Sequence, residues 1–186
     1  MNDALLDHQR LFASLYSIAP QIDAALQLLK ACINRGNKIM LCGNGGSAAD
    51  CQHFAAELTG RYKADRHPLA AIALTTDSSA LTAIGNDYGY EEVFARQVRA
   101  LGKPGDVLVA ISTSGRSLNV LGSFAAAKWA GMDIIMLTGS AVPPWIADVW
   151  IAVPSTDTPR IQEAHAFILH HWADEIESSY MNLPKE

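Results

Sequence analysis

Two side chains that can transfer protons or bind a metal stand four residues apart in the first half of the chain, His53 and Glu57. Residues at this spacing lie on one face of an α-helix, so the imidazole and the carboxylate would point to the same side. Such a pair can bind a metal ion or act in acid–base catalysis. Exposed pairs without a function show the same spacing, and the pair alone leaves both possibilities open.

A second set of polar side chains lies in an otherwise apolar stretch near the C-terminal end: Gln162, Glu163, His165, His170 and His171. A buried histidine needs a hydrogen-bond partner, and any single one is more often a core residue than a ligand. Gln162 and His170 are eight residues apart, a rise of roughly 12 Å along a helix. If both serve one site, we expect a neighbouring subunit to supply one of them.

The segment IMLCGNGGSAAD at 39–50 joins an apolar run to a predicted helix through Gly43, Asn44, Gly45 and Gly46, with Ser47 as the predicted N-cap. Glycines permit positive φ angles and a close approach of backbone to ligand. The N–H groups at a helix N-terminus attract anions. Neither the dinucleotide fingerprint GxGxxG nor the GK[ST] of a P-loop is present. By itself this glycine loop is equally consistent with a ligand site and a tight turn.

A second loop contains four hydroxyl side chains and follows the apolar run VLVAI at 107–111. Hydroxyls and helix N-terminal N–H groups can together surround a phosphate without a lysine. One serine would be enough to cap a helix, so the number of hydroxyls favours a phosphate site. The residues of this serine loop are Ser112, Thr113, Ser114, Gly115, Arg116 and Ser117.

The elements that must position these loops alternate along the chain as apolar runs and helical stretches, which is typical of parallel α/β sheets with helices on both faces. In such sheets ligands bind beyond the carboxyl ends of the strands, where the strand order reverses. Both loops would then line one crevice. Residues 85–89 (GNDYG) favour a turn. Expected strands are 38–42, 71–74, 107–111, 134–137 and 149–153; expected helices are 4–34, divided at Pro20, and 48–62, 78–86, 91–101, 117–130 and 158–180.

Composition limits the possible function classes. The chain has 186 residues and a formal net charge of −5, which suits one domain and argues against nucleic-acid or anionic-membrane binding. Cys32, Cys42 and Cys51 form no CxxC spacing, so we expect reduced thiols and a cytoplasmic location. We expect no signal peptide, since the N-terminal residues lack a positive region followed by an apolar core, and no apolar stretch reaches the roughly 18 residues that a membrane span needs.

Several long motifs, in this order, resemble the sugar isomerase (SIS) domain family, and within it the phosphoheptose isomerases. They are CGNGGSAADCQHFAAELTGRY at 42–62, ALTTDSSALTAIGNDYGYEEVFARQV at 73–98, ISTSGRSLNVL at 111–121 and VPSTDTPRIQEAH at 153–165. The resemblance covers nearly the whole chain. It implies a single SIS domain over 1–186, with an N-terminal helical segment (1–35) in an oligomer interface and an α/β core (36–186). The core would be a three-layer sandwich around a five-stranded parallel sheet.

The resemblance also implies roles for individual residues. Glu57 and His170 would be the acid–base pair, and His53, Glu57, Gln162 and His170 would bind one zinc ion per subunit. Substrate would be bound by Asn44, Gly45, Gly46, Ser47, Glu57, Asn86, Asp87, Ser112, Thr113, Ser114, Ser117 and Gln162. The implied assembly is a homotetramer with active sites at subunit interfaces.

The implied reaction is the aldose–ketose isomerisation of sedoheptulose 7-phosphate to D-glycero-D-manno-heptose 7-phosphate, a step towards bacterial surface polysaccharide. A carboxylate such as Glu57 would move a proton between C1 and C2 through an enediol. Two departures from the family pattern stand out. Pro159 replaces an Asp found in some members, and residues 140–145 (SAVPPW) replace a glycine-rich loop.

Two other functions remain as alternatives. Some related SIS-domain proteins are adaptors that bind the replication initiator DnaA, and these typically replace the residues matching Glu57 and His170. A regulatory SIS domain that senses a sugar phosphate would keep the serine loop without needing that pair. Because His53, Glu57 and His170 are all present, we favour the enzyme.

Overall fold

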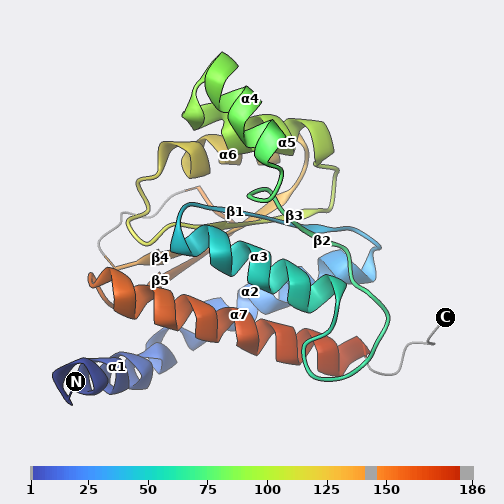
Figure 1. The fold of residues 1–186 in the computed structure, drawn as a ribbon. Helices are drawn as coiled ribbons and strands as arrows, with labels where there is room; N and C mark the ends of the chain where they lie inside the picture. Colours follow the sequence, from blue (N-terminus) through green and yellow to red (C-terminus); the bar gives the residue numbers. More distant parts are fainter. Residues whose placement is uncertain (1, 141–145, 181–186) are drawn as a thin grey trace.

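The computed structural model describes residues 2–140 and 146–180 and is built around a five-stranded sheet (Figure 1). All neighbouring strands are parallel, in the order β2-β1-β3-β4-β5. The predicted parallel sheet is therefore confirmed. The strands are β1 (Ile39–Gly43), β2 (Ala71–Ala73), β3 (Val107–Ile111), β4 (Asp133–Gly139) and β5 (Val149–Val153).

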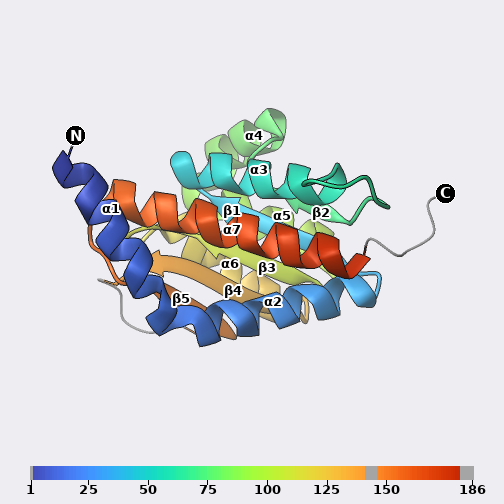
Figure 2. The same cartoon turned by 90° about the horizontal axis from the view of Figure 1, so that it is seen from below.

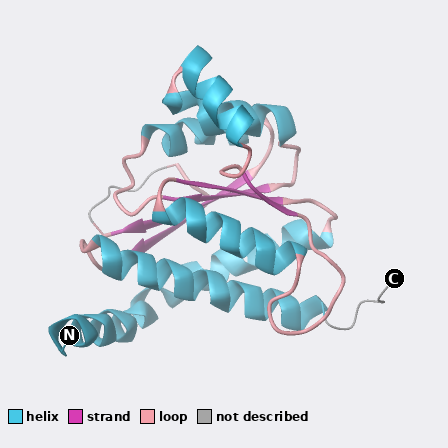
Figure 3. Cartoon of the chain, viewed as in Figure 1, coloured by secondary structure: helices cyan, strands magenta, loops and turns pink. Residues whose placement is uncertain are grey.

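Helices cover both faces of the sheet, as Figure 3 shows. Side chains alternate between the faces along each strand, so Leu41 and Val109 join one core cluster while Met40 and Leu108 join the other. One face is covered by α1 (Asn2–Ser14), α2 (Ala19–Asn34), α3 (Gly46–Thr59) and α7 (Thr158–Tyr180). The other is covered by α4 (Ser78–Tyr88), α5 (Val93–Leu101) and α6 (Leu118–Trp129).

The N-terminal region forms two helices, separated by a short 3₁₀ turn at Leu15–Ile18. Pro20 lies in the first turn of α2, where its missing N–H costs no helical hydrogen bond. The predicted division at Pro20 is thus confirmed. Figure 2 shows α1 and α2 alongside α7 on the same side of the sheet, and the Trp172 indole N–H donates to the Ile22 carbonyl over 3.1 Å.

The predicted turn at 85–89 is wrong, because α4 continues through Asn86 and Asp87 to Tyr88. The Asp77 carboxylate caps the start of the helix by accepting from the Ala80 N–H at 2.9 Å. Gly89 ends it with a φ of 90°, a conformation that favours glycine. These two caps set the boundaries and outweigh the turn preference of Asn and Asp.

The strand order reverses between β1 and β3, which are neighbours in the sheet although β2 lies between them in the chain. Gly43 and Ile111, the last residues of these strands, are register partners. The glycine loop and the serine loop therefore leave the sheet side by side, at the place where such folds bind ligands.

In the described ranges, 2–140 and 146–180, no helix has the length and apolar character to cross a membrane. Cys32, Cys42 and Cys51 are buried free thiols, as expected. The departure noted at 140–145 falls largely on residues 141–145, which lie outside the described residues.

A buried carboxylate on α7 fixes the loop that follows α3. Glu177 accepts hydrogen bonds from the backbone N–H groups of Tyr62, Lys63 and Ala64 at 2.7–2.9 Å. It also lies 3.7 Å from the guanidinium of Arg66, which donates to the Glu57 and Leu58 carbonyls at the end of α3. Because both charged side chains are almost fully buried, each depends on the other for compensation.

Glu177→Gln is expected to lower the free energy of unfolding by about 2–4 kcal/mol, because it removes the main counter-charge of Arg66 and places an NH₂ group among N–H donors. Burial raises the pKa of Glu177, but the hydrogen bonds and Arg66 outweigh burial, and the pKa lies below its usual value. The contribution is therefore present above the unfolded-state pKa of about 4.3 and is lost as pH falls through the lower folded-state value.

Urea unfolding of both proteins between pH 7 and pH 3 checks this. The difference between them should shrink as the pH falls. Glu175→Gln is the matched control. That exposed carboxylate pairs with Lys30, and its replacement should cost about 0.5 kcal/mol or less. An equal loss in the two variants at pH 7 would contradict the role given to Glu177.

Candidate active site

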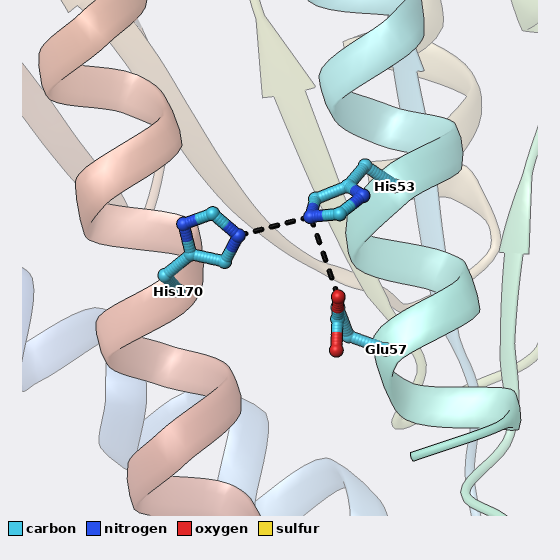
Figure 4. A group of neighbouring side chains, drawn as sticks. All are labelled: His53, Glu57 and His170. Atoms are coloured by element: carbon cyan, nitrogen blue, oxygen red, sulfur yellow. Dashed lines mark hydrogen bonds and ion pairs between the residues drawn. The ribbon is translucent and has the colours of Figure 1, made fainter. Parts of the chain in front are cut away.

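His53, Glu57 and His170 meet between α3 and α7, which pack side by side (Figure 4). The Nε2 atom of His53 lies 2.9 Å from the Nε2 atom of His170 and 3.3 Å from Oε1 of Glu57. His170 thus joins His53 and Glu57 within a single chain. The sequence hypothesis of a neighbouring subunit is not needed to bring His170 to this cluster.

The cluster fits a metal ion. One potential ligand atom from each of the three side chains lies within 4.8 Å of the other two. Oε2 of Glu57 is buried, and it has no hydrogen-bond partner among the residues that the structure describes. Two facing imidazole nitrogens beside an unpaired carboxylate oxygen make the donor set that Zn²⁺ prefers.

Gln162, the fourth predicted ligand, belongs to α7 and lies beside the first residue of α3. A Cβ atom added to Gly46 would come within 2.4 Å of the Gln162 Nε2 atom, so the amide rests directly against the glycine loop. His53 lies about two turns further along the helix than Gly46, and Glu57 lies about one turn beyond His53. Gly46 is therefore required for a close approach of side chain to backbone.

Two further residues surround the cluster. The ring of Tyr62 stacks on His170, with centroids 5.7 Å apart and an interplanar angle of 29°. Because the Tyr62 N–H donates to Glu177, that carboxylate also helps to fix the ring on which His170 stacks.

Sequence reasoning missed Asp50, which lies one turn before His53. Burial raises the pKa of Asp50, while His53 and His170 oppose the rise.

The position of Asp50 could have been read from the sequence. Asp50, His53 and Glu57 follow an i, i+3, i+7 pattern and share one helix face. Oδ2 of Asp50 is buried and lacks a hydrogen-bond partner within the described part of the chain. The face of α3 that carries the cluster is therefore more acidic than the His53/Glu57 pair alone indicates.

The glycine loop presents backbone N–H groups at the start of α3. The N-cap is Gly45 and not the predicted Ser47, and its φ of 56° favours glycine. The helical hydrogen bonds begin at Ala48, whose N–H reaches the carbonyls of Asn44 and Gly45. The N–H groups of Gly45, Gly46 and Ser47 precede this first bond and are those that a helix start offers to an anion.

The serine loop folds back on itself before α6. The Ser112 and Ser117 hydroxyls are 3.1 Å apart, and the Ser112 hydroxyl also accepts from the Gly115 N–H at 3.1 Å. Ser114 accepts from the Arg116 N–H at 3.2 Å. Beside the loop is a cavity of about 190 Å³ whose lining includes Thr113, Ser114, Ser155, Thr156 and Thr158. Hydroxyl groups thus converge where a phosphate is predicted.

Two sequence-predicted residues behave differently. The Asn86 amide donates to the Asp87 carboxylate at 2.7 Å, and both side chains are exposed on α4. Since α4 lies on the opposite face of the sheet from α3 and α7, a contact of either residue with a sugar stays a prediction.

His165 is a core residue, as expected for a single histidine. It is fully buried and contacts the Thr138 carbonyl at 3.2 Å, and burial lowers its pKa to about 4.

Comparison with known proteins gives consistent matches. The SIS domain model matches residues 8–139. A phosphoheptose isomerase of Helicobacter pylori (strain P12) is 52% identical over 179 residues, covering 95% of this chain and 93% of that protein. One from Campylobacter concisus is 49% identical over 175 residues, covering 93% of each.

Two solved structures match over nearly the full chain. The phosphoheptose isomerase of Neisseria gonorrhoeae has a TM-score of 0.88 at 47% identity, covering 95% of this chain and 96% of that one. The enzyme from Francisella tularensis has a TM-score of 0.90 at 36% identity, with the same coverage.

Proposed function

The chain belongs to the phosphoheptose isomerases of the SIS-domain family, and we propose that Glu57 and His170 carry out its reaction. That reaction is the aldose–ketose isomerisation of sedoheptulose 7-phosphate to D-glycero-D-manno-heptose 7-phosphate. The observation that carries the residue assignment is the meeting of His53, Glu57 and His170, where a buried carboxylate oxygen is left unpaired.

The two loops at the switch point hold the substrate. The hydroxyls of Ser112, Thr113, Ser114 and Ser117 surround the phosphate, together with the N–H groups at the start of α6. The N–H groups of Gly45, Gly46 and Ser47 contact the sugar phosphate from the neighbouring loop. A substrate anchored at its C7 phosphate then extends along α3 towards Glu57, which puts the reacting carbons beside the carboxylate.

Glu57 takes a proton from C1 of the ketose and returns it to C2 of the enediol, which produces the aldose. His170 relays a proton from O1 to O2, so that both oxygens end in the correct protonation state. Oε2 of Glu57 suits this role because it is buried and has no hydrogen-bond partner among the described residues.

His53, Glu57 and His170 would hold a zinc ion. Gln162, the fourth predicted ligand, lies against Gly46 in this chain, about two turns of α3 from His53, so a neighbouring subunit would supply it. When bound, Zn²⁺ supplies electrostatic stabilisation to the oxygens of the enediolate. Three protein ligands would leave a coordination position open, whereas four would restrict access.

We also propose that the chain forms a cytoplasmic homotetramer that supplies heptose for surface polysaccharide. Apolar side chains around α1 and α2, among them the partly buried Phe12 and the exposed Tyr16, line a cavity of about 320 Å³ that a second copy would cover. The DnaA adaptor function finds no support, since the relatives compared are named as isomerases.

The test is to incubate the purified protein with sedoheptulose 7-phosphate and to follow formation of the aldose by chromatography, with and without added zinc. We expect conversion to an equilibrium mixture. The absence of turnover under both conditions would overturn the proposed function, and turnover by heat-unfolded protein would reveal a contaminant or a chemical background.

A further inference from the structure

Two amide side chains join the loops that meet at the switch point. Asn44 follows β1 and begins the glycine loop, while Asn119 lies in the first turn of α6, directly after the serine loop. The Asn44 Nδ2 group donates to Asn119 Oδ1 at 2.8 Å, and the Asn119 Nδ2 group donates back to Asn44 Oδ1 at 2.9 Å. Each amide is thus both donor and acceptor to the other.

Both amides have further partners. The Tyr90 hydroxyl, from the segment after α4, donates to Asn44 Oδ1 at 3.1 Å. Asn119 Oδ1 also accepts from the Val120 N–H at 3.0 Å. Each carbonyl oxygen therefore has two donors, which uses its two lone pairs. Asn119 is 3% exposed, so its side chain has little access to solvent or to a ligand.

This pairing limits what the Asn44 side chain can do. Its oxygen is saturated, and one of its two N–H groups is occupied by Asn119. The sequence assigned Asn44 to substrate binding alongside Gly45 and Gly46. The geometry favours binding through the backbone N–H groups of this loop, with the Asn44 side chain turned towards the protein.

We propose that Asn119 is a positioning residue for the isomerisation: its amide holds Asn44 and thereby fixes the glycine loop relative to the serine loop. This inference rests on the proposed function, because the spacing of the two loops sets how a substrate anchored by its phosphate reaches Glu57. A displacement of about 1 Å in such a site can cost about 100-fold in rate. A pair of amides between neighbouring strand ends is well suited to prevent such a displacement, since breaking the pair leaves a polar group without a partner.

The test is a double-mutant cycle on kcat/KM for sedoheptulose 7-phosphate. Asn44→Ala and Asn119→Ala should each lower it by about 10–100-fold, and the double variant should lose no more than the worse single variant, because each amide acts through the other. Asn119→Asp, which keeps the size of the side chain, should behave like Asn119→Ala, since it presents an oxygen to Asn44 Oδ1. Losses that multiply in the double variant would overturn the inference. So would a large loss in Asn44→Ala that Asn119→Ala does not share.

A matched control separates positioning from stability. Ser123 is one turn further along α6, is 0% exposed, and donates to the Val120 carbonyl at 2.6 Å. Ser123→Ala should lower the melting temperature yet keep kcat/KM within about twofold when assayed well below that temperature. An equal loss of activity in Ser123→Ala would also overturn the inference.

The cycle is repeated with the calorimetric affinity for sedoheptulose 7-phosphate, so that the inference has a readout that does not depend on turnover. If the wild-type protein binds this sugar but does not convert it, the proposed reaction has failed. The coupling between Asn44 and Asn119 is then read from the affinities, with the same expected non-additive pattern. Additive affinity losses would reject the positioning role whatever the turnover.

Discussion

Glu57→Gln is expected to lower kcat for sedoheptulose 7-phosphate by about 10³-fold, with a change in KM of about threefold or less. The amide keeps the size of the side chain but cannot take a proton from C1. Because we propose that the serine loop and the N–H groups at the start of α3 hold the phosphate, and residue 57 lies near the other end of α3, substrate binding should survive the change. Initial rates of aldose formation over a range of substrate concentrations give both constants.

The same variant has an expected effect on stability that a structural carboxylate would not show. Oε2 of Glu57 is buried without a hydrogen-bond partner in the described ranges, and such a group destabilises the fold. Replacing the charge by a neutral amide should therefore leave the melting temperature unchanged or raise it by a few degrees. Glu175 is another helical carboxylate, exposed and paired with Lys30, and Glu175→Gln should change neither kcat nor the melting temperature appreciably.

Two results would count against Glu57 as the base. One is a kcat for Glu57→Gln within about tenfold of the wild-type value. The other is a loss of activity that follows the fraction of unfolded protein, because the carboxylate would then serve the fold and not the reaction.

The sheet could be predicted from the sequence because its strands are short, continuous apolar runs, and the central strands β1 and β3 are buried on both faces. The run VLVAI at 107–111 has this pattern, and β3 occupies the same residues. Helix boundaries were less predictable at α4, where Asn86 and Asp87 indicated a turn. The capping interactions of Asp77 and Gly89 decide those boundaries, and a local propensity count does not include them.

The site could be predicted only where its residues share an element or a loop. His53 and Glu57 were found because they are one turn apart on one helix. The position of His170 depends on how α7 packs against α3, which the spacing within α7 does not reveal. That a second subunit brings Gln162 and His170 to one site stays a prediction. Asn119 was missed because its partner Asn44 is 75 residues away in the chain, and only the strand order brings the two together.

Protein stripped with a chelator is expected to bind one zinc ion per chain, and His170→Gln should bind it at least about 100-fold more weakly. Loss of a residue that only supports a ligand typically costs 10–100-fold in metal affinity, and His170 would be a ligand itself. Figure 4 shows that its Nε2 atom points to His53, so its loss removes one of the three converging donors. Titration calorimetry with Zn²⁺ measures both the affinity and the number of ions bound.

The neighbouring histidine provides the matched control. His171 lines the apolar cavity with Phe12 and Tyr16, on another side of α7 from the cluster. His171→Gln should therefore bind zinc as tightly as the wild-type chain, although the two variants remove the same chemical group from adjacent positions. Equal weakening in both variants would indicate a general disturbance of α7. If His170→Gln binds zinc like the wild type, the metal site lies elsewhere, and the unpaired oxygen of Glu57 then belongs to proton transfer alone.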